Sequence, residues 1–120
     1  MDLTIAERLM AMQTLPGKAN FVELLVIDEA RKALGFTSDE LEEFGLKTEV
    51  KGDQMNTRWD EAHETTVRPI ALSAVAVKIL KKQLDDMDTK GELTLQHVSL
   101  FEKVHDNAPD HDTTAAGGTG

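Results

Sequence analysis

The chain has 120 residues, which is enough for one domain and too few for two of ordinary size. Hydrophobic residues make up 40% of the sequence and charged residues 29%, the balance of a folded globular protein rather than a disordered one. The absence of cysteine excludes disulfides, thiolate metal sites and a cysteine nucleophile. No apolar run reaches the roughly 18 residues of a membrane-spanning helix, so no membrane insertion is expected.

The net charge of −9, from 22 acidic residues against 13 Lys and Arg, restricts the partners further. Proteins bind phosphate backbones mainly through clustered basic side chains, so this sequence predicts no direct nucleic acid binding. A basic protein fits the charge better, including one whose basic groove otherwise holds nucleic acid.

Helices are predicted at the start of the chain. Thr4 and Glu7 have the spacing of a capping box, which predicts a helix running to about Gln13. Pro16 and Gly17 then end any helical pattern.

A second helix is predicted after Asn20, over "FVELLVIDEARKAL", with Gly35 as a left-handed cap at its end. Its wide apolar set predicts a central, well-buried helix; the set comprises Phe21, Leu24, Leu25, Ile27, Ala30 and Leu34. Thr37 and Glu40 form a further capping box before a short helix that Gly45 closes.

Strands are predicted in the middle of the chain. "LKTEV" and "MNTRW", joined by "KGDQ", alternate in polarity and predict a hairpin with one buried face, anchored by Trp59. "TTVRPIAL" predicts a third strand, which Pro69 confines to a sheet edge. The expectation is a three-stranded antiparallel sheet.

A helical pair is predicted to follow. Ser73 is placed to cap a helix with an apolar stripe of Ala76, Ile79, Leu80, Leu84 and Met87, and Thr94 to cap the last helix, "LQHVSLFEKV". The prediction is therefore an α+β fold with N-terminal helices, a three-stranded antiparallel sheet and a C-terminal helical pair. Residues 1–105 would form a single compact domain, and residues 106–120 a flexible acidic and Gly-rich tail.

The connection "DMDTKGELTLQH" resembles the calcium loop of an EF-hand. Asp86, Asp88 and Gly91 match its first, third and sixth positions, but Lys90 replaces an oxygen ligand and His97 the final bidentate Glu. An ammonium and an imidazole are poor substitutes for oxygen around a hard cation. The sequence predicts a helix stop, a glycine turn and no bound metal or cofactor, with a degenerate EF-hand-like metal module as an alternative.

Catalytic patterns are weak. The four histidines lack metal-ligand spacing, and the serines lack a nucleophile-elbow context. Arg58, Asp60, His63 and Glu64 around Trp59 could supply acid–base groups, although such a neighbourhood arises by chance among 22 acidic residues. The prediction is a protein that is not an enzyme.

Several segments together resemble a group of small proteins of tailed phages and prophages, for which no activity is assigned. They are "LPGKANFVELLVIDEARKALGFTSDELEEFGLK", "TRWD", and "ILKKQLDDMD" with "GELTLQHVSLFEKV", and they cover most of residues 9–104. The resemblance implies a phage or mobile-element gene product located in the host cytoplasm or the virion.

These observations predict a non-catalytic accessory protein that binds a host or viral protein, in particular a basic one, through an acidic surface. The expected partner-binding residues are Glu40, Glu43, Asp85, Asp86 and Asp88. The alternative is a structural or assembly component of the virion, such as a connector or an accessory capsid or tail protein. The oligomeric state is left open.

Overall fold

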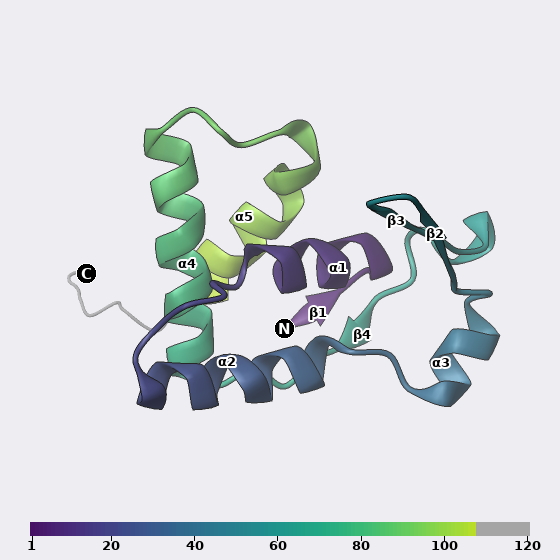
Figure 1. The fold of residues 1–120 in the computed structure, drawn as a ribbon, viewed down its shortest axis with the longest axis horizontal. Helices are drawn as coiled ribbons and strands as arrows, with labels where there is room; N and C mark the ends of the chain where they lie inside the picture. The colour runs from purple at the N-terminus through teal and green to yellow at the C-terminus, as the bar shows by residue number, and fades with distance from the viewer. Residues whose placement is uncertain (108–120) are drawn as a thin grey trace.

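The computed structural model describes residues 1–107 as an α+β fold with five α-helices and two separate two-stranded antiparallel sheets (Figure 1). The helices are α1 (Ile5–Thr14), α2 (Phe21–Leu34), α3 (Ser38–Glu43), α4 (Ala74–Thr89) and α5 (Val98–Asn107), and the strands are β1 (Asp2–Leu3), β2 (Lys47–Lys51), β3 (Gln54–Arg58) and β4 (Arg68–Pro69). Two 3-10 turns, η1 (Glu61–His63) and η2 (Leu95–His97), complete the order. The predicted end of the domain, at residue 105, falls inside α5. The predicted tail lies outside the described residues, apart from Asp106 and Asn107.

The predicted starts of the first four helices are confirmed, whereas the last α-helix begins at Val98, after a 3-10 turn, rather than at Leu95. Thr4 and Thr37 each accept a hydrogen bond from the backbone N–H three residues on, and the Glu side chain at that position accepts one from the cap's own N–H. Asn20 and Ser73 cap α2 and α4 through their side chains. These contacts satisfy N–H groups that the helix leaves without a partner. Because each contact joins residues only three positions apart, local sequence signals are enough to locate the helix starts.

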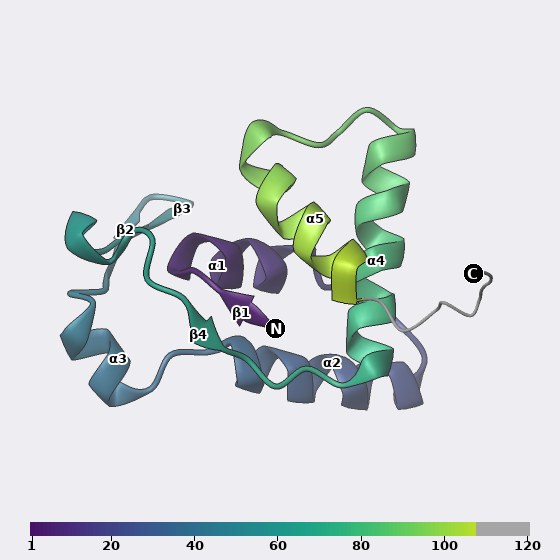
Figure 2. The ribbon, with the colours of Figure 1, turned by 180° about the vertical axis from the view of Figure 1, so that it is seen from behind.

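Four helices enclose the main core. α1 packs against α2, α4 and α5, and α4 also packs against α2 and α5. Figures 1 and 2 show α1 and α2 stacked, with α4 crossing one end of both. The fully or nearly fully buried core residues are Leu3, Ala11, Leu15, Ile27, Ala30, Leu34, Ile70, Ala76, Val77, Leu80, Leu84, Leu100 and Val104.

The predicted three-stranded sheet is wrong. β2 and β3 form a hairpin with Lys47 opposite Arg58, whereas β4 pairs with the N-terminal strand β1, placing Asp2 opposite Pro69. The chain turns away after β3 because the Asp60 N–H bonds the Phe44 carbonyl at 2.8 Å and η1 follows. Pro69 has no N–H to donate, which suits a two-stranded edge pairing.

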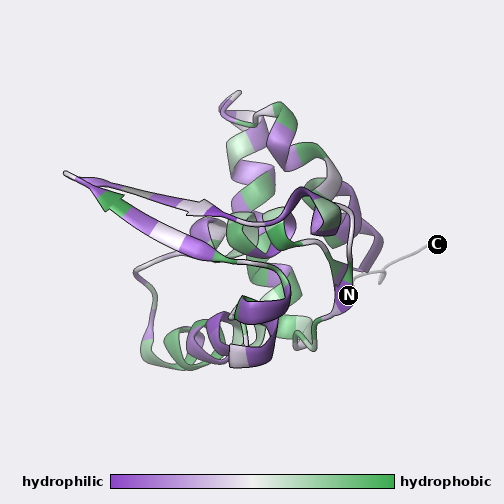
Figure 3. Ribbon diagram, turned by 90° about the vertical axis from the view of Figure 1, so that its right-hand side faces the viewer, coloured by the Kyte–Doolittle hydropathy of each residue, from purple (hydrophilic) through white to green (hydrophobic). Residues whose placement is uncertain are grey.

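The hairpin also lacks the predicted buried face. Its strands project from the helices (Figure 3), and Val50 is 69% exposed. Gly52 has a φ of 61° in the tight connection, a conformation that glycine adopts without steric cost. Trp59 is half-buried at the base of the hairpin, so it does not anchor a covered sheet.

The end of α2 differs from the prediction of a left-handed glycine cap. Gly35 has a φ of −63° and a ψ of 162°. The Arg8 guanidinium from α1 donates to the Leu34 carbonyl at 3.1 Å and also to the Gly35 carbonyl. A side chain distant in sequence thus satisfies carbonyls that a left-handed cap would otherwise satisfy.

The connection between α4 and α5 is a helix stop with a glycine turn, as predicted. Gly91 has a φ of 68°, and the N–H groups of Lys90, Gly91 and Glu92 bond carbonyls in the last turn of α4 at 2.8–3.1 Å. Thr94 caps the 3-10 turn η2, which leads directly into α5.

Candidate functional site

Glu40, the first predicted partner-binding residue, is part of the folded framework. Its carboxylate receives two hydrogen bonds from Arg8, at 2.8 and 3.1 Å, while its own side chain completes the cap of α3. Arg8 is only 2% exposed, and its guanidinium lies 3.9 Å from the Phe36 ring centre. The hydrogen bond from Arg8 holds the pKa of Glu40 below its usual value, against the opposing effect of burial.

Glu43 and Asp85 also have internal cationic partners. Glu43 forms an ion pair with Arg68, which extends over the Phe44 ring. Asp85 contacts Lys81 at 2.9 Å and the His105 imidazole at 2.8 Å. Burial raises the pKa of Asp85, but these two hydrogen bonds outweigh it, so the pKa lies below the usual value.

Asp86 and Asp88 are exposed near the end of α4. This end of the helix lies far from α3, at the opposite end of the molecule in Figures 1 and 2. The five predicted residues therefore form two separate groups rather than one acidic surface.

The α4–α5 connection holds its histidine internally. His97 is buried, and its Nδ1 accepts a hydrogen bond from the Thr94 N–H at 3.0 Å. His105, the last residue of the predicted domain, stacks on Phe101 with ring centres 4.2 Å apart. Within residues 1–107, no three His, Cys, Asp or Glu side chains converge in a way that could hold a metal ion.

Two of the candidate acid–base residues around Trp59 have partners outside the group. Arg58 forms an ion pair with Glu49 across the hairpin, and His63 lies against Phe44 with ring centres 5.0 Å apart. The His63 Nδ1 lies 3.3 Å from the Thr66 hydroxyl.

The most distinctive surface is on α2, where the sequence predicted core residues. Phe21 is 73% exposed, Val22 70%, Leu25 53% and Leu24 38%. α2 forms one long side of the body in Figures 1 and 2, while α1 and α4 pack against it. We refer to these four side chains as the apolar face of α2. Four large apolar groups exposed on neighbouring turns are unusual for a surface that contacts water alone.

A hollow of about 190 Å³ adjoins this face, between α2 and the turn that follows α1. Leu24, Ile27 and Pro16 give it apolar walls, and Asp28 and Arg31 lie at its rim. Asp28 is paired with Lys32 one helical turn on, at 3.0 Å. An apolar ridge beside a hollow is a shape into which a partner side chain can pack.

The sequence did contain a signal for this face. An α-helix turns by about 100° per residue, which places Phe21 and Leu25 roughly opposite the buried Ile27, Ala30 and Leu34. The wide apolar arc predicts deep burial, but a single stripe is enough for packing against the core. The rest of the arc faces outward.

Within the described part of the chain, no helix is long and apolar enough to cross a membrane. Comparison with protein-family models, with curated proteins and with solved structures finds no match to this chain.

Proposed function

We propose that this protein is a non-catalytic accessory protein that binds another protein through the apolar face of α2. The observation that carries the proposal is the exposure of Phe21, Val22 and Leu25 on one side of a helix whose other side is buried in the core. Removing apolar surface from water contributes about 25 cal/mol of free energy per Å². Covering this face with a complementary apolar surface therefore favours association.

The charge of the chain supports a basic partner. Glu23, Asp28 and Glu29 lie along α2, and the whole sequence carries a net charge of −9. A partner with an apolar patch and a basic rim would be attracted electrostatically and would match these carboxylates. These carboxylates and the net charge of the chain then assist encounter, while the apolar face supplies the contact.

The resemblance to phage and prophage proteins supports a host or viral protein as the partner, in the host cytoplasm or the virion. Capture of a basic host protein would favour an effector role. Recovery of portal or capsid subunits would favour the virion assembly role.

Affinity capture with matched variants tests the proposal. Phe21→Ser combined with Leu25→Ser removes the centre of the apolar face, and Leu95→Ser removes an isolated apolar side chain that is 92% exposed on η2. From a lysate of infected host cells, we expect the parent and Leu95→Ser to capture equal amounts of the same basic partner. The double variant should capture at least tenfold less of it. Equal capture by all three proteins would contradict the proposal.

A stability measurement separates binding from folding. Because Phe21 and Leu25 are mostly exposed, their replacement should change the free energy of unfolding by no more than about 1 kcal/mol. Urea unfolding of the parent and the double variant checks this.

A further inference from the structure

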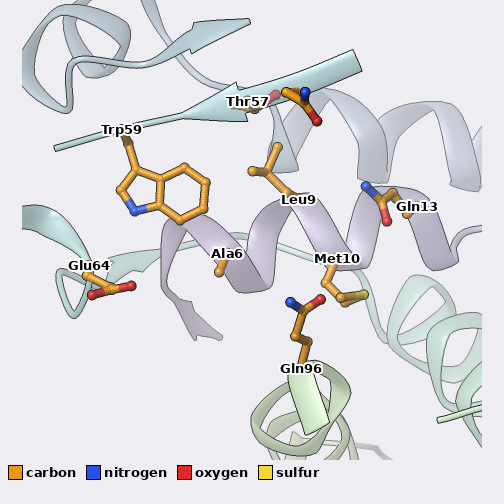
Figure 4. Close-up of a pocket in the computed structure, with 9 residues that line it drawn as sticks. Ala6, Leu9, Met10, Gln13, Thr57, Trp59, Glu64 and Gln96 are labelled. Carbon is orange, nitrogen blue, oxygen red and sulfur yellow. The ribbon is translucent and has the colours of Figure 1, made fainter. Parts of the chain in front are cut away.

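A second feature lies on the other side of α1, around Trp59. Trp59 lines a cleft of about 630 Å³ between β3, α1 and η2 (Figure 4). It also lines a neighbouring hollow of about 270 Å³. The indole is half-buried at the junction of β3 and η1. Its ring therefore faces space large enough for a side chain.

The walls of the cleft combine an apolar floor with an amide rim. α1 contributes Leu9 and Met10 to the floor, and Gln13 and Gln96 place amides around it (Figure 4). The amide of Asn56 also lines the cleft. None of the residues that line this cleft is Lys or Arg. Amides at the rim can pair with a peptide backbone without specifying its side chains.

Uncompensated carboxylates lie beside the indole. Glu64 lines both spaces and Glu61 lines the smaller one. In the described chain, neither carboxylate forms an ion pair, unlike Glu7, Glu40, Glu43, Glu49 and Asp85. Arg58 also borders the smaller hollow, but its guanidinium is bound by Glu49. A negative potential therefore remains next to the ring.

The edge of β3 faces the cleft as well. Asn56 and Thr57 are consecutive and so point to opposite faces of the strand, yet both line the cleft. β3 pairs with β2 in a two-stranded sheet, and among residues 1–107 its other edge has no strand partner. Unpaired N–H and C=O groups on such an edge can pair with an added extended segment.

We propose that this cleft binds an extended segment of a partner protein and receives an arginine side chain against Trp59. Tryptophan is the aromatic side chain with the strongest attraction for a cation over its ring. A planar guanidinium can stack on the indole while its N–H groups bond Glu61 and Glu64, which a compact ammonium does less well. The segment's backbone would lie along the β3 edge and the amide rim.

The site is separate from the apolar face of α2. Ala6, Leu9, Met10 and Gln13 of α1 face the cleft, whereas α2 packs against α1 elsewhere. The two surfaces can therefore be tested independently.

The probe is the blocked peptide acetyl-Gly-Arg-Gly-Arg-Gly-amide, with its lysine counterpart for comparison. Trp59 is the single tryptophan of the chain, so its indole N–H signal in a proton–nitrogen correlation spectrum reports on the site directly. Glu61→Gln with Glu64→Gln removes the two carboxylates. Glu42→Gln with Glu102→Gln, both exposed residues elsewhere, removes the same amount of charge.

We expect a saturable shift of the indole signal with the arginine peptide, weakened at least tenfold by Glu61→Gln with Glu64→Gln and less than twofold by the control pair. The lysine peptide should bind at least threefold more weakly. Equal weakening by both variant pairs would reduce the effect to general charge attraction and overturn the proposal. So would equal binding of the lysine peptide, or no saturable shift up to millimolar peptide. Glu64→Gln alone, with an unchanged circular dichroism spectrum, provides the same test if the double variant does not fold.

Discussion

The Arg8 guanidinium and the Glu40 carboxylate meet through two hydrogen bonds, at 2.8 and 3.1 Å, and join α1 to α3. The same guanidinium satisfies the carbonyls of Leu34 and Gly35 at the end of α2. One buried cation therefore fixes three helices relative to one another. It also withdraws Glu40 from the acidic surface that the sequence predicted.

Replacing Arg8 should be strongly destabilising. Arg8→Ala removes the guanidinium donors from two backbone carbonyls and from the Glu40 carboxylate, which keeps the hydrogen bond from the Thr37 N–H. Breaking such a buried ion pair costs about 3–5 kcal/mol. Arg31→Ala, on the exposed side of α2, should change the free energy of unfolding by no more than about 0.5 kcal/mol. Urea unfolding followed by circular dichroism measures both, and equal effects would show that Arg8 does not act as described.

Stability should fall in acid partly because of Glu40. Its pKa is lower in the folded chain than the ordinary value of 4.5, so the folded state favours the ionised form. The resulting stabilisation is complete above the unfolded pKa and is lost as the pH falls through the folded pKa.

Glu40→Gln isolates this contribution. The variant should be less stable than the parent at neutral pH, and its stability should decline less between about pH 5 and pH 3. Urea unfolding at a series of pH values provides the test, with Glu42→Gln on the same helix as the control for charge. A parallel decline in Glu40→Gln and the parent would refute the assignment.

Two glycines should differ in their tolerance of alanine. Gly91→Ala forces a side chain into a φ of 68° but meets no atom within 4 Å, so we expect a cost of about 1 kcal/mol. At Gly45, with a φ of 63°, the added Cβ would also lie 3.0 Å from an Asp60 carboxylate oxygen, and the cost should be larger. Gly17→Ala, with no positive φ and no neighbour, should leave stability unchanged or slightly raised. Thermal unfolding of the three variants would reveal any other order.

The stability of the protein should not depend on the carboxylates near the end of α4. Asp86→Asn together with Asp88→Asn removes two anions from the negative end of the α4 dipole. Each anion at that end destabilises the helix by about 0.3–1 kcal/mol. We expect stability to be unchanged or slightly higher, measured in urea with and without a chelator. A large loss that the chelator reproduces in the parent would instead indicate a bound cation.

Local features of this fold could be predicted from the sequence. The caps at Thr4, Asn20, Thr37 and Ser73, and the glycine turn at Gly91, each depend on a few neighbouring residues. Their hydrogen bonds close within one helical turn, so no distant contact is needed to specify them.

Features that depend on distant contacts were missed. The pairing of β1 with β4 joins residues more than 60 positions apart, and β1 has only two residues, too few for a periodic pattern. The end of α2 depends on Arg8, which lies 26 residues from Leu34. The exposure of Phe21 and Leu25 follows from where the other helices pack, which hydrophobicity alone does not determine.

The most direct test of the proposed function is photo-crosslinking from the apolar face of α2. A photoreactive amino acid at Val22, which is 70% exposed, is compared in infected host cells with the same group at Asp86 near the end of α4. We predict a covalent adduct from position 22 to one partner protein, through a segment with apolar residues flanked by Lys or Arg. Adducts from position 86 and none from position 22 would contradict the proposed role of α2.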